Sequence, residues 1–300
     1  MPNNALRYIL AVAQAGSIRM AANTLNVAQS AISRQILNVE EDLGTPLFER
    51  HPRGVSPTPA GEVFLRYARD DRALAERVRS ELDALKGLRR GMVRIWAIES
   101  VAQEVLPRAI ARFTESNPGI RFEVTVTSTE EVIAAVQDVR ADLGVAFQPQ
   151  VPADLRVSFR IRHPLHAIMS ARHPLAGIDR ISIVETLSYP IALNPPGSGS
   201  RMLIDATVSA AGAVLVPTLE SNSVRLLTHF ASEATGITFL SRFCGSPELR
   251  SGELKSVRLR DRLMNVARLE ILTQAARTLP TVAEQFQNHL RRELQAGPRN

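Results

Sequence analysis

A cluster of polar and cationic side chains near the N-terminus could read the sequence of DNA. Gln29, Ser30, Ser33 and Arg34 follow one another closely along the chain. Glutamine and arginine can each make two hydrogen bonds to one base edge in the major groove, and serine can contact a base or a phosphate. These residue types therefore favour a base-reading surface. The alternative is a helical hairpin whose outer face is only solvated.

A second group of cationic side chains follows this cluster in the sequence and could contact the DNA backbone. Arg50 and Arg53 belong to a basic turn with Gly54 at its tip, behind an apolar anchor at Leu47 and Phe48. This pattern is typical of a short winged hairpin, whose arginines reach phosphates or the minor groove. We therefore expect Arg50 and Arg53 to hold the protein on DNA rather than to select its sequence.

Three expected helix starts farther along the chain offer N–H groups and hydroxyls to an anion. They lie at Ser100, at Ser128 and Thr129, and in a Gly/Ser loop that contains Ser198 and Ser200. The first two have the pattern of a capping box. Helix N-termini favour anions, and carboxylates in particular. For each serine taken singly, simple capping is the alternative, because every helix must satisfy its first N–H groups.

The patterns that would indicate catalysis are incomplete. The Gly/Ser loop lacks the spacing of a nucleophile elbow and has no P-loop lysine. His163 and His166 are close in sequence but lie in a segment broken by proline, so a metal pair is not expected. Cys244 has no histidine near it in sequence. We therefore expect neither an enzyme nor a cofactor; the alternative is a DNA-binding head fused to a catalytically active α/β domain.

The elements that must position the base-reading cluster are three short helices over residues 4–43. One apolar face of the first helix holds Leu6, Ile9, Leu10 and Ala13. The second helix, at about 18–25, is rich in small residues, which lets a neighbouring helix approach closely. The third, at about 28–43 with Gly44 as its stop, carries the cluster in its N-terminal half. Such a compact trihelical unit is the helix-turn-helix pattern.

A long helix is expected to follow the hairpin. It starts at Thr58, tolerates Pro59 in its first turn and meets no breaker before Gly87. A heptad seam runs along it, formed by Phe64, Ala68, Asp71, Ala75, Val78, Leu82 and Leu85. We expect this seam to pair with a second copy of the chain, since so long a helix has little surface of its own domain to cover. One amphipathic helix packed on its own domain is the alternative.

From residue 92 onward, short apolar runs alternate with helical segments, a pattern that implies a largely parallel sheet. A first series has strands at 93–98, 122–126 and 143–147 and helices at 101–114 and 130–139. A second has strands at 166–170, 189–193, 214–219 and 237–240 and helices around 183 and at 200–211 and 223–233. A strand at 266–273 and a helix at 280–294 close the chain. Two α/β lobes hinged around a cleft are therefore expected.

The N-terminal block resembles the LysR-type transcriptional regulators. The residues that carry the resemblance, in the family's order and spacing, are Leu6, Arg7, Tyr8, Ala15, Gly16, Ser17, Ala21, Ala22, Leu25, the run 29–36, Glu40, Leu43, Gly44, the run 46–50 and the run 58–61. Looser matches follow at 106–119, 141–144, 173–175 and 197–201. Two departures are Ala28, where the family usually has a capping Ser worth about 1 kcal/mol, and Met20, where Arg is common.

The resemblance implies a winged helix-turn-helix domain over residues 1–60 that is all-α apart from its short wing. A linker and dimerisation helix over 61–90 would follow, and then an effector-binding domain over 91–300. The last domain is expected to be α/β, two-lobed and similar in fold to periplasmic binding proteins. Its lobe I would cover about 91–161 and 266–300, and its lobe II about 162–265. Such a protein binds an inverted-repeat operator in double-stranded DNA as a homodimer or homotetramer.

The same resemblance extends the two sets of expected contacts. The DNA contacts are Ser17, Arg19, Gln29, Ser30, Ser33, Arg34, Arg50 and Arg53. The effector contacts that match positions around the family's cleft are Ser100, Ser128, Thr129, Ser198 and Ser200. Phe147 and Gln148, at the end of an expected strand, could line the same cleft. The expected effector is a small organic anion, a carboxylate in particular. Glu99 and Glu130 flank two of the helix starts, and because Glu99 could pair with a ligand ammonium, an amino acid is the alternative.

Composition agrees with this class of protein. Of 300 residues, 45% are hydrophobic and 22% are charged, which suits two folded domains and excludes a wholly disordered chain. No run approaches the roughly 18 apolar residues of a membrane span, and the first residues do not form a signal peptide. This disfavours a solute-binding protein for transport. The one cysteine cannot form an internal disulfide, so a cytoplasmic protein is expected. A net charge of +6 is compatible with DNA as a partner.

Overall fold

The computed structural model describes residues 3–52, 54–85, 91–233, 235–242 and 246–296. The expectations for Arg53, for the end of the linker at 86–90 and for Cys244 lie outside these residues. The chain divides into two compact units, Met1–Arg79 and Ser80–Asn300.

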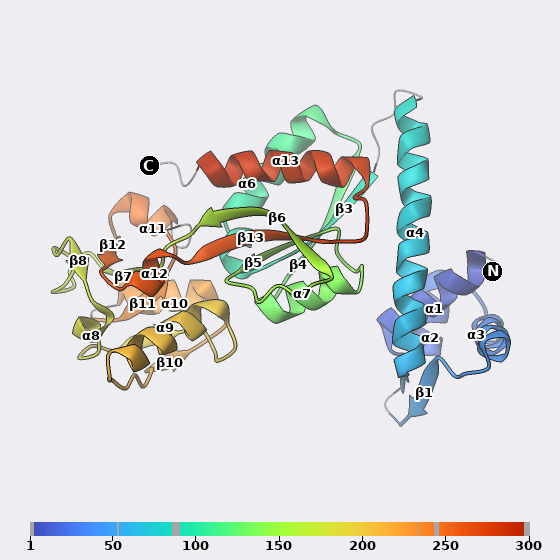
Figure 1. Cartoon of the computed structure of the whole chain (residues 1–300), viewed down its shortest axis with the longest axis horizontal. Coiled ribbons are helices and arrows are strands. Elements are labelled where there is room, and N and C mark those ends of the chain that lie inside the picture. The colour runs from blue at the N-terminus through green and yellow to red at the C-terminus, as the bar shows by residue number, and fades with distance from the viewer. Residues whose placement is uncertain (1–2, 53, 86–90, 234, 243–245, 297–300) are drawn as a thin grey trace. The chain divides into compact units, whose positions relative to one another are not determined.

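The first unit consists of short helices and a two-stranded hairpin, gathered at the start of a long helix (Figure 1). Its elements are α1 (Asn3–Ala15), α2 (Ile18–Leu25), α3 (Gln29–Leu43), β1 (Phe48–His51), β2 (Gly54–Pro57) and the first part of α4 (Pro59–Leu85). Ser17 caps α2, and Gly44 ends α3 in the left-handed conformation. Ala21 and Ala22 of the short α2 are buried, as close packing of its neighbours requires. The expected trihelical unit with a wing is confirmed.

The long helix α4 shows where the heptad prediction was partly wrong. Phe64 and Ala68 are buried in the core of their own unit, together with Leu65. The first two turns of α4 therefore pack internally, because α1 to α3 leave an apolar surface that these residues cover. Large apolar side chains farther along α4 are exposed, including Val78 at 48% and Leu82 at 51%. Any seam between chains must lie in this later part.

Within the second unit, one five-stranded sheet has the order β4-β3-β5-β13-β6. Its strands are β3 (Gly91–Ala97), β4 (Ile120–Val126), β5 (Leu143–Phe147), β6 (Leu155–Arg162) and β13 (Arg268–Gln274). The helices around it are α5 (Glu99–Ala102), α6 (Val105–Ser116), α7 (Thr129–Gln137) and α13 (Thr281–Ala296). Helices α6 and α13 lie on one face and α7 on the other (Figure 1). Both faces of β5 are thus covered, and all of its residues are buried.

Two details of this lobe differ from the sequence prediction. The sheet is mixed, because β13 returns from the other lobe and runs antiparallel to both β5 and β6. The helix expected at 101–114 is two helices, α5 and α6. Pro107 explains the break: a continuous helix would bring its ring against the carbonyl of Gln103. The helix therefore restarts at Val105, with Pro107 in its first turn.

The second lobe is built on a six-stranded sheet with the order β10-β9-β11-β7-β12-β8. Its strands are β7 (His166–Ser170), β8 (Arg180–Ile181), β9 (Ile191–Leu193), β10 (Leu219–Glu220), β11 (Ile237–Leu240) and β12 (Leu254–Leu259). Its helices are α8 (Ile183–Thr186), α9 (Gly199–Ala210), α10 (Val224–Ser232), α11 (Ser246–Ser251) and α12 (Arg262–Asn265). The strand expected at 214–219 was wrong: Val214 and Val216 are exposed, and only Leu219 and Glu220 pair with β9.

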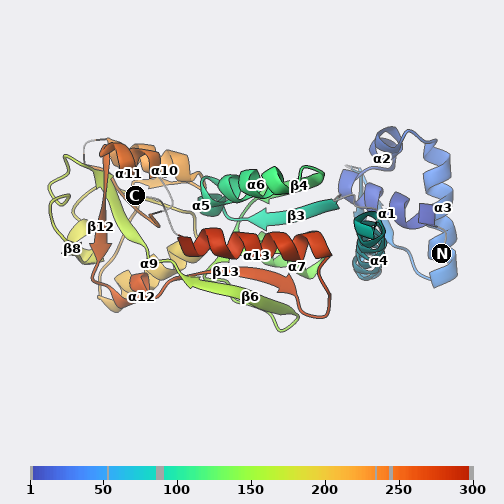
Figure 2. The same ribbon diagram turned by 90° about the horizontal axis from the view of Figure 1, so that it is seen from above.

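Two crossing segments join the lobes of the second unit, one after β6 and one before β13 (Figure 2). They are hydrogen-bonded to each other: His163 N donates to Ala267 O at 2.8 Å, and Leu165 N donates to Met264 O at 3.1 Å. Paired segments of this kind can act as a hinge, since few φ/ψ angles need to change for the lobes to move. The expected two lobes are therefore present, and the hinge between them stays a prediction.

Candidate functional site

The N-terminal half of α3 presents the residues expected to read DNA. Gln29, Ser30 and Arg34 are exposed, and Ser33 is half-buried. The opposite face of the helix is held in the core by Ile32, Ile36 and Val39. Ala28 occupies the N-cap position and makes no side-chain capping bond, as its departure from the family pattern predicts. The first N–H groups of this helix therefore have no side-chain cap and could donate hydrogen bonds to a phosphate.

The hairpin of β1 and β2 is anchored to the turn between α1 and α2. Val55 N donates to Gly16 O at 2.9 Å. Gly54 lies at φ 142°, and a Cβ there would collide with the same Gly16 oxygen, so the close approach requires glycine. Arg50 is exposed on β1, opposite Val55. The wing thus holds Arg50 outward at a fixed position. Arg19, near the start of α2, is also exposed, whereas Ser17 is half-buried by its capping role.

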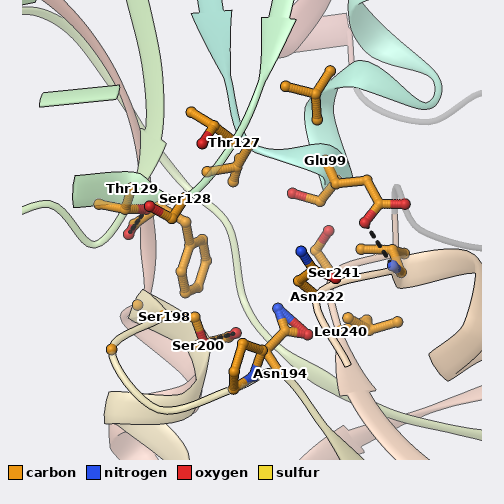
Figure 3. Close-up of a pocket in the computed structure, with 18 of the residues that line it drawn as sticks. Glu99, Thr127, Ser128, Thr129, Asn194, Ser198, Ser200, Asn222, Leu240 and Ser241 are labelled. Atoms are coloured by element: carbon orange, nitrogen blue, oxygen red, sulfur yellow. Dashed lines mark hydrogen bonds between the residues drawn. The ribbon is translucent and has the colours of Figure 1, made fainter. Parts of the chain in front are cut away.

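A cavity of about 600 Å³ lies between the two lobes of the second unit. It brings together six of the seven residues expected to bind an effector, namely Ser100, Ser128, Thr129, Phe147, Ser198 and Ser200. Ser128 and Thr129 lie across from Ser198 and Ser200 (Figure 3). Gln148 is not among the lining residues. Its side-chain oxygen accepts from Arg268 N at 2.9 Å, so this side chain is bonded to the start of β13.

Helix N-termini from both lobes open into this cavity. Ser128 caps α7, accepting from Glu131 N at 3.3 Å, and Ser198 caps α9, accepting from Arg201 N at 3.3 Å. Ser223, at the start of α10, also lines the cavity and caps its helix. The capping prediction for Ser100 was wrong. Helix α5 begins one residue earlier, at Glu99, which leaves Ser100 inside the first turn and facing the cavity.

Glu99 connects the lobes across the cavity. Its Oε2 accepts from Val224 N, the first N–H of α10, at 2.7 Å (Figure 3), and its Oε1 accepts from Gln103 Nε2 at 3.1 Å. A carboxylate is well placed at a helix N-terminus because the partial positive charge there stabilises it. Both oxygens of Glu99 are therefore engaged with donors of the protein itself.

The electrostatics of the cavity come from dipoles rather than from cations. None of the described residues that line it is lysine or arginine. Burial, with a smaller effect of His166, lowers the pKa of His163 to about 4, so this lining imidazole is neutral at pH 7. Arg201, just beyond the Gly/Ser loop, is paired with Asp205 at 2.8 Å and with Glu220 at 2.5 Å. The first-turn N–H groups of α7 and α9 and the hydroxyls beside them thus supply the donors.

Several lining residues were missed by the sequence analysis, namely Thr127, Asn194, Asn222, Ser223 and Ser241. A signal for some of them was present. Asn194 directly follows β9 and Ser241 directly follows β11, and polar residues at the carboxyl ends of strands are where α/β sheets bind ligands. Among the described residues, no group of His, Cys, Asp and Glu could hold a metal ion, and no described helix is long and apolar enough to cross a bilayer.

A DNA-reading head joined to a two-lobed domain with a polar interlobe cavity defines, by class, a ligand-binding transcriptional regulator. The chain belongs to the LysR family of such regulators. Residues 3–62 match the family described as "Bacterial regulatory helix-turn-helix protein, lysR family". Residues 86–295 match the family described as "LysR substrate binding domain". The resemblance on the N-terminal motifs is therefore confirmed, and the second match extends it to the C-terminal domain.

Three known proteins illustrate the similarity. The transcriptional regulator CbbR of Rhizobium meliloti is 28% identical over 302 residues, which cover 94% of this chain and 96% of that protein. A full-length OxyR variant of Pseudomonas aeruginosa has a TM-score of 0.77 at 21% identity, covering 97% of this chain and 95% of that chain. CbnR in complex with its target DNA has a TM-score of 0.64 at 20% identity, covering 98% and 100%. The two structures support the fold.

Proposed function

We propose that this regulator reads an inverted-repeat operator with paired heads and that a small organic anion in the interlobe cavity changes its hold on DNA. It would act in the cytoplasm as a homodimer or homotetramer and would catalyse no reaction. The observation that carries the proposal is the cavity itself, in which helix starts from both lobes present hydroxyl and N–H donors. A ligand that contacts both lobes favours their closed arrangement, and differential affinity of this kind is what shifts a conformational equilibrium.

The DNA contacts proposed are those of α3 and the wing. Gln29, Ser30, Ser33 and Arg34 would read bases in the major groove, and Ser17, Arg19, Arg50 and Arg53 would contact the backbone. Exposure of Gln29, Ser30, Arg34 and Arg50 supports this assignment. The relative CbnR, whose structure was determined with its target DNA, supports the placement of such a head on a duplex.

We expect Arg34→Ala to lower operator affinity by about 1–3 kcal/mol and to relax sequence preference, because a guanidinium that binds one base edge is lost. Arg50→Ala is the matched control: it should weaken operator and scrambled DNA alike and reduce the salt slope by about 1. Titrations of both duplexes at several salt concentrations measure both effects. If Arg34→Ala leaves the preference for operator intact, another residue reads the bases.

A carboxylate is the effector class that the cavity favours. Glu99 already shows that a carboxylate is accepted at one helix start, and its oxygens are bonded to the protein rather than directed at a ligand. This argues against an ammonium as the recognised group. Glu99 and Glu130 both line the cavity, which disfavours a multiply charged anion. We therefore propose a small monocarboxylate held between the starts of α7 and α9.

Ser100→Ala and Ser198→Ala should each weaken binding of such a carboxylate by about tenfold or more, because a hydrogen bond to a charged group contributes about 1.5–3 kcal/mol. A thermal-shift screen would compare carboxylates, amino acids, sugars and amines, with each variant referred to its own ligand-free melting temperature. Ser182→Ala is the control, since Ser182 caps α8 and does not line the cavity. Two results would contradict the proposal. One is that only a sugar or an amine raises the melting temperature; the other is that neither substitution changes the shift that a carboxylate produces.

A further inference from the structure

A second cavity, of about 420 Å³, lies in lobe II, apart from the interlobe cavity. It is lined by residues of β7 and β12 and of the segments that follow β11 and precede β8. The two cavities share none of their lining residues. The polar residues around the second cavity are His166, Asp179, Arg242, Lys255, Ser256 and Arg258.

Two cationic side chains of this cavity, Arg242 and Arg258, act on a buried histidine. His166 on β7 is 8% exposed and stands directly opposite Arg258 in the antiparallel ladder with β12. Residues opposite each other in a sheet project from the same face, so their side chains are neighbours. His166 Nδ1 lies 2.7 Å from Ser256 Oγ. Burial, followed by the guanidinium groups of Arg242 and Arg258, lowers the pKa of His166 to about 4.

Lys255 and Arg258 have no acidic partner in the part of the chain that the structure describes, since no carboxylate there lies within ion-pair distance of either. Asp179, the one acid of the lining, is 3.9 Å from Arg180, which stands beside Arg258 on the neighbouring strand. Arg180 and Arg258 are paired positions on neighbouring strands, so their like charges repel one another, and a bound anion would relieve that repulsion.

The rest of the lining is apolar and gives the cavity room for more than an inorganic ion. The apolar members are Ala176, Ile178, Leu249, Leu254 and Val257. A ligand that fits must therefore carry its charge at one end and a small hydrophobic skeleton at the other. This combination separates the site from the interlobe cavity, which has hydroxyls and carboxylates but no lysine or arginine among its described lining.

We propose that this lobe II cavity is a second ligand site, for a small organic phosphate monoester, whose phosphate is held by Arg242 and Arg258 beside His166. Arginine presents a planar fork of donors that matches phosphate oxygens, and two guanidiniums balance the two charges of a monoester. The site does not depend on the carboxylate proposed for the interlobe cavity.

Calorimetric titration of the full-length protein with three probes tests the site: phenyl phosphate, benzoate and inorganic phosphate. Followed through the ring signals of His166, which lines this cavity alone, phenyl phosphate should bind saturably and about tenfold more tightly than benzoate, which has the same ring but less charge. It should also bind more tightly than inorganic phosphate, which cannot use the apolar wall. Ring signals of His166 in a histidine-selective NMR spectrum should shift as phenyl phosphate is added.

Arg258→Gln should weaken phenyl phosphate about tenfold or more. Arg121→Gln, which removes the same charge from an exposed position on β4, should change it by less than about twofold. Ser198→Ala in the interlobe cavity should have no effect. Absence of saturable binding, equal losses in both arginine variants, benzoate that shifts the His166 ring signals as tightly as phenyl phosphate does, or a loss of phenyl phosphate binding on Ser198→Ala would each overturn the proposal.

Discussion

Replacing Val78 and Leu82 together with glutamate is expected to split the oligomer and to lower affinity for an inverted-repeat operator by about 10²-fold or more. Both side chains lie in the later part of α4 and are exposed, at 48% and 51%. They lie one turn apart on the seam that the heptad spacing defines. Two like charges per helix would face each other in the buried seam of a dimer, which disfavours association.

Sedimentation of the double variant measures the oligomer, and operator titration measures the loss of paired binding. The matched control is Val78→Leu with Leu82→Met, which changes the same two positions but keeps them apolar. That control should sediment and bind as the parent protein does. An unchanged mass in the glutamate variant would show that α4 is not the interface and that another surface holds the chains together.

How far the sequence predicted each unit depended on whether the signals were local. The helices of the first unit were placed within about a residue, because their apolar faces and their caps, such as Ser17 and Gly44, lie within a few residues of the elements they define. The first turns of α4 were assigned to the wrong partner. The heptad pattern predicts that Phe64 and Ala68 are buried, but it does not predict whether their own domain or a second chain buries them.

One strand was overlooked and another was misplaced. Strand β6 alternates Leu155, Val157, Phe159 and Ile161 with polar residues, a strand pattern that the sequence analysis missed, and it pairs with β13 in the structure. Arg160 also binds Glu270 of β13 at 2.6 Å, across a separation of 110 residues. For Val214 and Val216 the error was the opposite one: a strand was expected there but did not form. Their high strand propensity was read as a strand, but no partner strand lies beside them and they are exposed.

The sequence analysis found the lining residues that cap helices and missed the lining residues that directly follow strands. Ser128 and Ser198 were located because a capping serine precedes a recognisable helix. Asn194 and Ser241 lack such a motif and reach the cavity only because the order of β9 and β11 in the sheet places their ends together. Gln148 was expected in the cavity because it follows β5. Its backbone has a φ of 47°, which no sequence pattern predicted. Its side-chain oxygen accepts from Arg268 N and does not line the cavity.

Gly199→Ala is expected to hold the lobes apart and to weaken effector binding in the interlobe cavity. Gly199 is buried at the first position of α9, in lobe II, and a Cβ there would lie far inside van der Waals distance of the Phe147 carbonyl oxygen, at the end of β5 in lobe I. A backbone oxygen cannot rotate away as a side chain could. The start of α9 must therefore retreat, and Ser198 and Ser200 move away from Ser128 and Thr129.

The cost of such overpacking is about 1–3 kcal/mol of unfolding free energy, and carboxylate binding should fall by more than tenfold because its donors no longer converge. Thermal melts with and without a stabilising carboxylate measure both quantities. Gly177→Ala is the matched control, since a Cβ at Gly177 meets nothing within 4 Å and the substitution adds the same methyl group to the same lobe. If Gly199→Ala keeps the full ligand-induced shift, contact between Gly199 and Phe147 is not required for the bound arrangement, and the closed lobes would have to be held chiefly by the bond from Val224 N to Glu99.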